Sequence, residues 1–69
     1  MSRTPVSSSN VVSVGYDQNT MTLEVEFTNG SIYQYFDVPE VEYHNLIGAE
    51  SVGRYLNQNI NASYRYAQT

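Results

Sequence analysis

The chain has 69 residues, of which 41% are hydrophobic and 13% aromatic, and it contains no cysteine. This length allows one domain with a thin core, and the missing thiols exclude disulfide cross-links and thiolate metal sites. Seven acidic residues stand against three arginines and no lysine; the net charge of −4 disfavours nucleic-acid binding, which relies on cations that displace phosphate counterions.

The first ten residues are rich in serine and contain a Thr4-Pro5 step, which predicts an extended arm over residues 1–10. They lack the apolar segment of a secretion signal, and no run in the chain approaches the roughly 20 apolar residues of a membrane span. We therefore expect a cytoplasmic protein with no membrane partner. Residues 11–66 are expected to form its single domain and residues 67–69 a tail.

Three short runs rich in β-branched and aromatic residues follow the arm, and turn-forming clusters separate them. They read VVSVGY from Val11, MTLEVEF from Met21 and IYQYF from Ile32. This spacing is typical of an antiparallel meander. We therefore predict three antiparallel strands.

The Asn29-Gly30 pair between the second and third runs indicates a two-residue type I′ hairpin turn, because both central residues of that turn need positive φ. This turn would pair Thr28 with Ser31 and fix the register. Side chains alternate between faces, so the phenols of Tyr33 and Tyr35 are expected to point away from the most apolar face. That apolar face would carry Leu23, Val25, Phe27, Ile32 and Phe36, and the opposite face Thr22, Glu24, Glu26, Tyr33 and Tyr35.

A four-residue loop at 17–20 would join the first and second strands. It would pair Tyr16 with Met21 and Val14 with Leu23, which extends the apolar face across the first strand. The apolar face would then include Val12 and Val14, and the opposite face Val11, Ser13 and Gly15.

Two helices are predicted after the strands. Asp37 and Pro39 suit the start of the first helix, and Gly48 suits its end. Ser51 would cap a second helix with the sequence VGRYLNQNI, within which Gly53 costs about 1 kcal/mol relative to alanine, so close packing against the sheet is expected there. Apolar stripes at helical spacing comprise Tyr43, Leu46 and Ile47 in the first helix and Val52, Tyr55, Leu56 and Ile60 in the second.

These elements together predict an α+β domain in which two short helices cover one face of a three-stranded antiparallel meander. The tail alternates Tyr64 and Tyr66 around Arg65. This alternation suits either a short fourth strand at the edge of the sheet or a mobile tail.

The order of these features resembles the KTSC domain, which is named for its occurrence at the C-terminus of some lysyl-tRNA synthetases and also occurs alone in bacteria and phages. The resemblance runs from about Ser8 to Tyr66. For function it implies no particular reaction, and RNA binding is the suggestion that the synthetase fusion raises. The elements that carry the resemblance are Gly15-Tyr16-Asp17, Leu23-x-Val25-x-Phe27, Asn29-Gly30, Tyr33-x-Tyr35, Val38-Pro39, Ser51-x-Gly53-x-Tyr55 and Ile60.

The residues favour a binding surface over a catalytic site. Strand tyrosines could stack nucleobases, but they also pack over neighbouring side chains without any such role, and Glu24 and Glu26 beside them would repel phosphates. We predict a non-enzymatic interaction module that contacts another copy of itself or a protein partner. RNA binding, with phosphate contacts from arginines, is the alternative. The candidate interaction face comprises Tyr33, Tyr35, Arg54, Tyr64, Arg65 and Tyr66.

Chemical sites are not expected. His44 is the sole histidine, and Glu40 stands four residues before it, which predicts a surface Glu–His pair on the first helix. The serines at 7–9 lack a nucleophile motif, and the acidic residues lack the spacing of a calcium loop. We therefore predict no catalytic residue, no cofactor and no metal.

Overall fold

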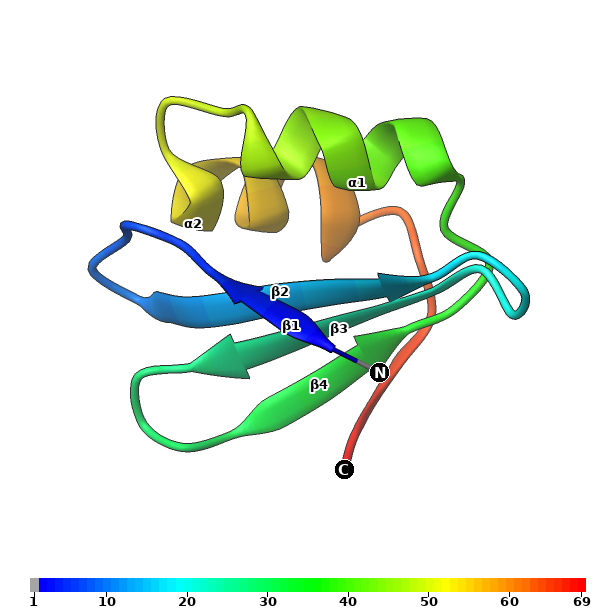
Figure 1. Cartoon of the computed structure of the whole chain (residues 1–69), viewed down its shortest axis with the longest axis horizontal. Coiled ribbons are helices and arrows are strands. Elements are labelled where there is room, and N and C mark those ends of the chain that lie inside the picture. The colour runs from blue at the N-terminus through cyan, green and yellow to red at the C-terminus, as the bar shows by residue number, and fades with distance from the viewer. Residues whose placement is uncertain (1) are drawn as a thin grey trace.

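The computed structural model describes residues 2–69, and within this part of the chain a five-stranded antiparallel sheet carries a helical layer on one face (Figure 1). Each strand pairs with the next one along the chain. The α+β class and the three central strands agree with the prediction. The strands are β1 (Arg3–Pro5), β2 (Val11–Asp17), β3 (Thr22–Phe27), β4 (Ile32–Tyr35) and β5 (Tyr66–Gln68).

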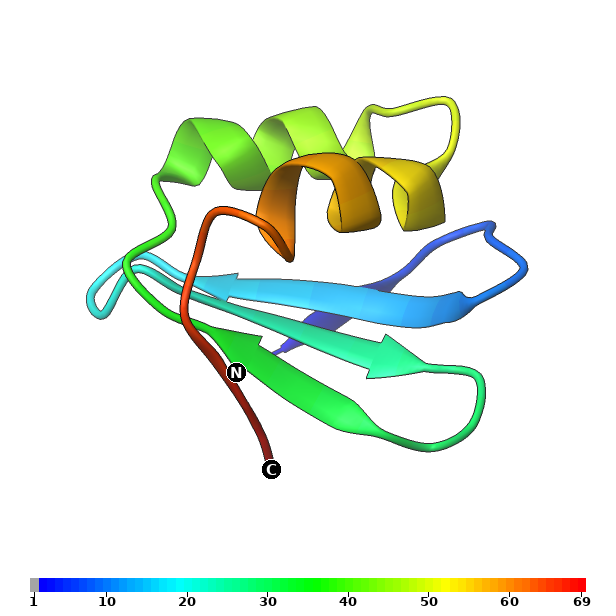
Figure 2. The ribbon, with the colours of Figure 1, turned by 180° about the vertical axis from the view of Figure 1, so that it is seen from behind.

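The two outer strands come from the two ends of the chain. β5 supplies the expected fourth strand at the edge, although it lies further along the chain than the Tyr64–Tyr66 alternation and includes two residues of the expected tail 67–69. Figure 2 shows the C-terminal tail beside β4, with which it pairs. β1 goes beyond the prediction, because part of the expected extended arm pairs with β2. Gly15 allows this close approach: a Cβ at that position would lie 2.5 Å from the Ser2 carbonyl oxygen.

The register of the β3–β4 hairpin corrects the prediction by one residue. Leu23 lies opposite Tyr35 and Val25 opposite Tyr33. Because a one-residue slip turns every side chain to the other face of the strand, both tyrosines share the helix-covered face with the aliphatic residues. The predicted outward orientation of these phenols is therefore wrong. Ile32, expected in the core, lies on the opposite side of β4, and Phe36, also expected there, follows the end of the strand and is only partly buried.

The physical reason lies in the turn. The Phe27 N–H donates to the Ser31 carbonyl at 2.8 Å, so residues 28–30 form the loop instead of Asn29-Gly30 alone. Gly30 takes a φ of 90°. A three-residue loop with glycine in the left-handed region is a common hairpin connection, and it satisfies the same local preference as the two-residue turn.

In β2, Val14 has the predicted orientation, whereas Val11 and Val12 have the reverse of it. Val14 is buried as predicted, although it lies opposite Val25, two residues beyond the predicted pairing, because an even shift preserves the face. The pairing shifts between Val11 and Ser13, which marks a β-bulge. This bulge turns Val11 into the core and leaves Val12 41% exposed, the reverse of the prediction.

The first helix, α1 (Glu40–Ile47), confirms the prediction. Its N-cap is Pro39, which has an extended backbone, and its C-cap is Gly48. Leu46 is fully buried against the sheet, whereas Ile47, the last member of the predicted stripe, is 40% exposed.

The second helix is confirmed as α2 (Val52–Tyr55), which continues directly into a π-helical turn, η1 (Leu56–Ile60). The Arg54 N–H donates to Ser51 Oγ at 3.2 Å, which is the predicted side-chain cap. The Asn61 N–H donates to the Leu56 carbonyl at 2.8 Å and closes the π turn.

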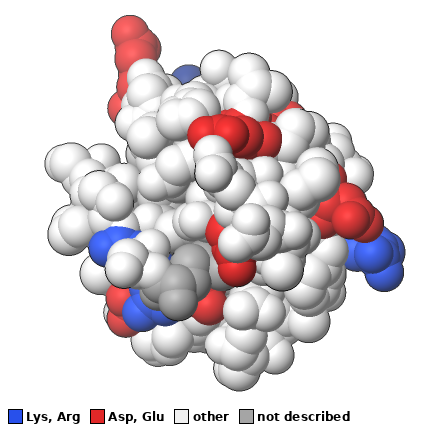
Figure 3. Space-filling model, turned by 45° about the vertical axis from the view of Figure 1, so that its right-hand side comes forward, with Lys and Arg blue, Asp and Glu red and all other residues white. Residues whose placement is uncertain are grey.

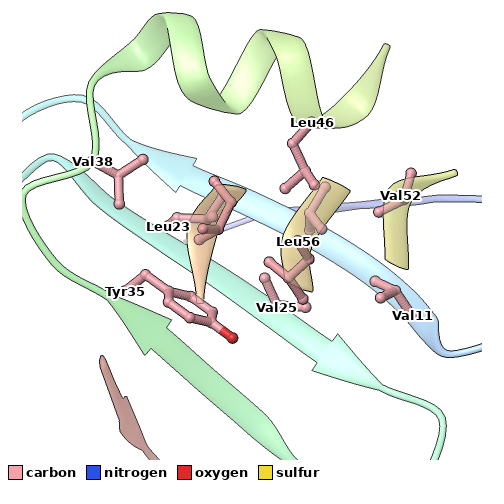
Figure 4. Close-up of a cluster of buried hydrophobic side chains, with 10 residues drawn as sticks. Val11, Leu23, Val25, Tyr35, Val38, Leu46, Val52 and Leu56 are labelled. Atoms are coloured by element: carbon pink, nitrogen blue, oxygen red, sulfur yellow. The ribbon is translucent and has the colours of Figure 1, made fainter. Parts of the chain in front are cut away.

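The core lies between the sheet and these helices (Figure 4). Tyr35 extends from β4 beneath the helical layer and is only 1% exposed. A tyrosine so placed contributes a large apolar ring but requires a partner for its hydroxyl. The fully buried aliphatic residues around it are Val11, Val14, Leu23, Val25, Val38, Leu46, Leu56 and Ile60.

A charged network on the outer face fixes β1 to the sheet. The Arg3 guanidinium lies 2.5 Å from Glu24 Oε1 and 3.5 Å from Glu26 Oε1, and its Nε donates to Ser13 Oγ at 3.1 Å. Partial burial acts to raise the pKa of Glu24, but hydrogen bonds from Gln34 and Arg3 and the charge of Arg3 outweigh it and hold the pKa below its ordinary value.

Replacement of Arg3 by alanine is expected to lower the free energy of unfolding by about 1–2 kcal/mol, because partly buried carboxylates lose a charged hydrogen-bond donor. Since the folded-state pKa of Glu24 is depressed, its contribution is present above the unfolded pKa and is lost as pH falls through the folded pKa. Urea denaturation between pH 7 and pH 3 measures both effects.

Thr4→Ala, in the same strand but exposed, is the matched control and should change stability by less than about 0.5 kcal/mol. If Arg3→Ala leaves the low-pH loss of stability as steep as in the unaltered protein, the network does not hold Glu24 ionised.

Candidate binding cleft

A cleft of about 520 Å³ opens between the β3–β4 hairpin and the second helix. Aromatic side chains from three strands form one side of it, and amide and hydroxyl groups from the helix and the loops form the other. The aromatic residues are Phe27, Tyr33, Tyr35 and Tyr66, and the polar residues are Asn10, Thr28, Asn29, Ser31, Asn57 and Asn61.

The aromatic side is a continuous wall. The Tyr66 ring lies 5.6 Å from the rings of both Tyr33 and Tyr35, which are 6.5 Å apart and stacked. Phe27 contacts Tyr33 edge-on at 5.5 Å. β-pairing explains this grouping, because Tyr66 of β5 lies directly opposite Tyr35 of β4. Tyr66 is 53% exposed, so the wall is open to solvent at this end.

A chain of hydrogen bonds joins the wall to the helix. The Tyr35 hydroxyl donates to Asn61 Oδ1 at 2.6 Å, and Asn61 Nδ2 donates to Asn57 Oδ1 at 2.9 Å. Asn57 lies within the π turn and Asn61 is its C-cap, and such turns occur often at functional sites. Burial, and then the neighbouring Tyr33 and Tyr66, raise the pKa of Tyr35 to about 12, so this phenol is neutral and a donor.

The cleft is uncharged. Within the described residues 2–69, its lining contains no arginine, aspartate, glutamate or histidine. Basic side chains on the face shown in Figure 3 occupy small separate spots, and acidic side chains are scattered over the same face. Glu24 and Glu26, predicted to flank the tyrosines, lie on the opposite face of the sheet, so the expected repulsion of phosphates beside the phenols is also wrong.

The predicted interaction residues divide into two groups. Tyr33, Tyr35 and Tyr66 meet in the cleft. The other three lie outside its lining. The Tyr64 hydroxyl donates to Glu42 at 3.0 Å, Arg65 pairs with Asp37 at 3.0 Å, and Arg54 lies exposed beside a separate depression.

Sequence reasoning missed the polar side of the cleft. Asn57 and Asn61 lie four residues apart on the second helix, and that spacing was a usable signal for one shared face. Asn10 reaches the same cleft from the segment before β2, and its sequence position gave no such indication. These amides become one surface only through tertiary packing.

Gly53 also lines the cleft, and its expected packing role is not found. A Cβ at this position would meet Ser8 and Asn10 side-chain atoms at 3.6 to 3.9 Å, which are ordinary van der Waals distances. The sheet does not approach it closely. The cost of glycine in a helix is therefore not offset by packing at this position.

The histidine outside the cleft forms an ordinary surface pair. His44 Nε2 lies 3.2 Å from Glu40 Oε2, which confirms the predicted pair on α1. Across residues 2–69, no three histidine, cysteine, aspartate or glutamate side chains gather in a way that could hold a metal ion. No helix in that range is long and apolar enough to cross a membrane.

Comparison with known proteins gives the family. Residues 7–64 match the KTSC domain. The chain belongs to the KTSC domain family. A crystal structure of a KTSC domain protein from Yersinia pestis superposes on it with a TM-score of 0.92 and 38% identity, covering 99% of this chain and 96% of that one. The resemblance noted from the sequence is thereby confirmed.

Two kinds of relatives carry this KTSC domain. An uncharacterized protein from Stutzerimonas stutzeri is 42% identical over 67 residues, which are 96% of this chain and 94% of that protein. A lysine–tRNA ligase from Nostoc punctiforme is 40% identical over 53 residues, which are 77% of this chain but 9% of the ligase. The fold thus occurs both in a protein of similar length and as a small part of a synthetase.

Proposed function

We propose that this KTSC domain is a non-enzymatic interaction module that binds a segment of a protein partner in its aromatic cleft. The observation that carries the proposal is the pair of solvent-accessible rings, Tyr33 and Tyr66, which lie beside the buried Tyr35 and opposite a row of amide groups. Tyrosine is enriched at protein interfaces, because it buries a large rigid ring at low entropic cost and adds a hydrogen bond.

The concave shape favours a partner segment over a second copy of the domain. A cleft of this size encloses a few side chains of an inserted chain, whereas two copies related by a two-fold axis would place the same concave surface against itself. The mass of the protein in solution separates these outcomes. A monomer is expected at micromolar concentration.

RNA binding remains the alternative, and the tyrosine wall is the observation in its favour, since stacked bases gain about 1–3 kcal/mol each on such rings. Charge weighs against it. The cleft lining has no cation in the described chain, and Arg65 already pairs with Asp37. Phosphate contacts supply much of the affinity for nucleic acid, so an uncharged cleft suits a protein segment better.

Site-specific photo-crosslinking tests the proposal. A benzoylphenylalanine at position 66 replaces a half-exposed aromatic ring in the cleft, and the same residue at Val41, which is 63% exposed on α1, is the matched control. In cells of the source, position 66 should yield discrete protein adducts that position 41 does not. Adducts of equal pattern at both positions, or adducts that nuclease removes, would contradict the proposal.

A further inference from the structure

The β3–β4 loop contains an asparagine followed by glycine, at the rim of the cleft. The chain has seven asparagines, and Asn29 alone among them precedes a glycine. Asn29 and Gly30 are both exposed at the tip of the hairpin, and Asn29 lines the cleft. A Cβ at Gly30 would meet no heavy atom within 4 Å, so the space beside this backbone is open to water.

A hydrogen bond folds the Asn29 side chain over its own backbone. Ser31 N–H donates to Asn29 Oδ1 at 3.0 Å, which makes an Asx turn. This donor polarises the carboxamide and stabilises the negative charge that develops on Oδ1 when a nucleophile adds to Cγ. The backbone nitrogen of Gly30 is such a nucleophile, held in the same chain segment, and its addition to Cγ closes a succinimide ring.

One contact opposes this addition. Gly30 N–H donates to the Phe27 carbonyl at 2.9 Å, and the nitrogen must leave this bond and lose its proton before it attacks. Residues 28–30 are all exposed, so the bond lies at the surface and not within a packed strand. Local opening of such a loop costs far less free energy than global unfolding. The contact therefore slows the addition but does not prevent it.

We propose that Asn29 is a self-modification site, at which the folded protein converts the asparagine to aspartate and isoaspartate without an enzyme. The Gly30 nitrogen bonds to Asn29 Cγ, and the carboxamide nitrogen takes up the Gly30 proton and leaves as ammonia. Water then opens the succinimide. Cleavage of the new Cγ–N bond gives aspartate, and cleavage of the backbone C–N bond gives isoaspartate. One water is consumed, one ammonia is released, and no oxidant or cofactor takes part.

Both products change the cleft. Aspartate preserves the Asx turn, because its carboxylate also accepts from Ser31 N–H, and it adds a negative charge to a lining that is uncharged within residues 2–69. Isoaspartate adds a carbon to the backbone of a three-residue loop, and loop length fixes the register of the hairpin. The reaction thus alters the charge of the binding surface in one branch and the pairing of β3 with β4 in the other.

Peptide mapping by mass spectrometry tests this inference on the unaltered protein, incubated at neutral and at mildly alkaline pH. Asn29 should convert at least about tenfold faster than each of the other six asparagines, which are matched controls in the same molecule. The rate should rise with pH, because the Gly30 amide must lose its proton. Anion-exchange chromatography should separate the products, since each carries one more negative charge than the starting protein.

Gly30→Ala, with its fold checked by circular dichroism, should slow the conversion at least about tenfold, because a side chain at position 30 hinders ring closure. An equal rate in the folded variant would overturn the inference. So would conversion of Asn29 no faster than that of Asn19, which is also exposed in a loop and precedes threonine. The reaction needs no partner, so failure of the cross-linking experiment would leave this inference standing, and failure here would leave the proposed function standing.

Discussion

Truncation of Tyr35 to alanine is expected to lower the free energy of unfolding by about 3–5 kcal/mol, the range measured when a large buried aromatic residue is removed from a core. The ring is 1% exposed beneath the helical layer, and its loss leaves both a cavity and the Asn61 carboxamide without its donor. Since domains of this kind are stable by about 5–15 kcal/mol, much of the protein should be unfolded at low urea. Circular dichroism during urea denaturation measures the effect.

Tyr66→Ala is the matched control, because Tyr66 lies opposite Tyr35 in the sheet but is 53% exposed. It should cost less than about 1 kcal/mol. This pair of variants also decides between the two hairpin registers. If Tyr35→Ala lowers the free energy of unfolding as little as Tyr66→Ala does, the register with a two-residue turn and outward phenols is correct instead.

The helices could be predicted from the sequence because their signals are local. Ser51 caps its helix through an atom three residues away, and Gly48 ends the preceding helix within its own last turn. The two edge strands needed more information. The alternation of Tyr64 and Tyr66 indicated a strand near the C-terminus but misplaced it, since β5 begins at Tyr66 and uses residues assigned to the tail. β1 depends on contacts of Arg3 with strands that lie far along the chain.

The hairpin register, unlike the helices, could not be predicted from local signals, because Asn29-Gly30 fits a two-residue turn and a three-residue turn equally well. Alternation favours the wrong turn, because Ile32 and Phe36 are more apolar than Tyr33 and Tyr35. The choice rests on a partner for a buried phenol. Asn61, 26 residues further along the chain, provides that partner, and no local pattern indicates it.

The candidate site was likewise predictable only in the part that residue type reveals. The tyrosines were identified by residue type, but on the assumption of an exposed sheet face, and the structure instead places them at the opening between sheet and helix. The amides opposite them come from the helix and from the segment before β2. A bulge in β2 sets the position of that segment, and bulges have no dependable signature in a single sequence.

Ionisation of Tyr35 should destabilise the folded protein at alkaline pH. Burial, reinforced by the Tyr33 and Tyr66 phenols, raises its pKa to about 12 from 10.0, so the neutral form is favoured in the folded state. The corresponding stability is fully present below pH 10 and is lost as pH rises toward 12, a change of about 3 kcal/mol by linkage. Absorbance at the phenolate band and urea denaturation between these pH values measure it.

Tyr35→Phe separates this group from the other tyrosines. The variant keeps the ring in the core and removes only the hydroxyl with its bond to Asn61. Its phenolate titration should lack the component near pH 12, and its stability should fall less steeply above pH 10 than that of the unaltered protein. Because burial raises the pKa of Tyr16 and Tyr64 as well, a smaller alkaline loss persists in the variant. An unchanged titration would show that the Tyr35 hydroxyl is open to solvent, which neither its burial nor the proposed cleft allows.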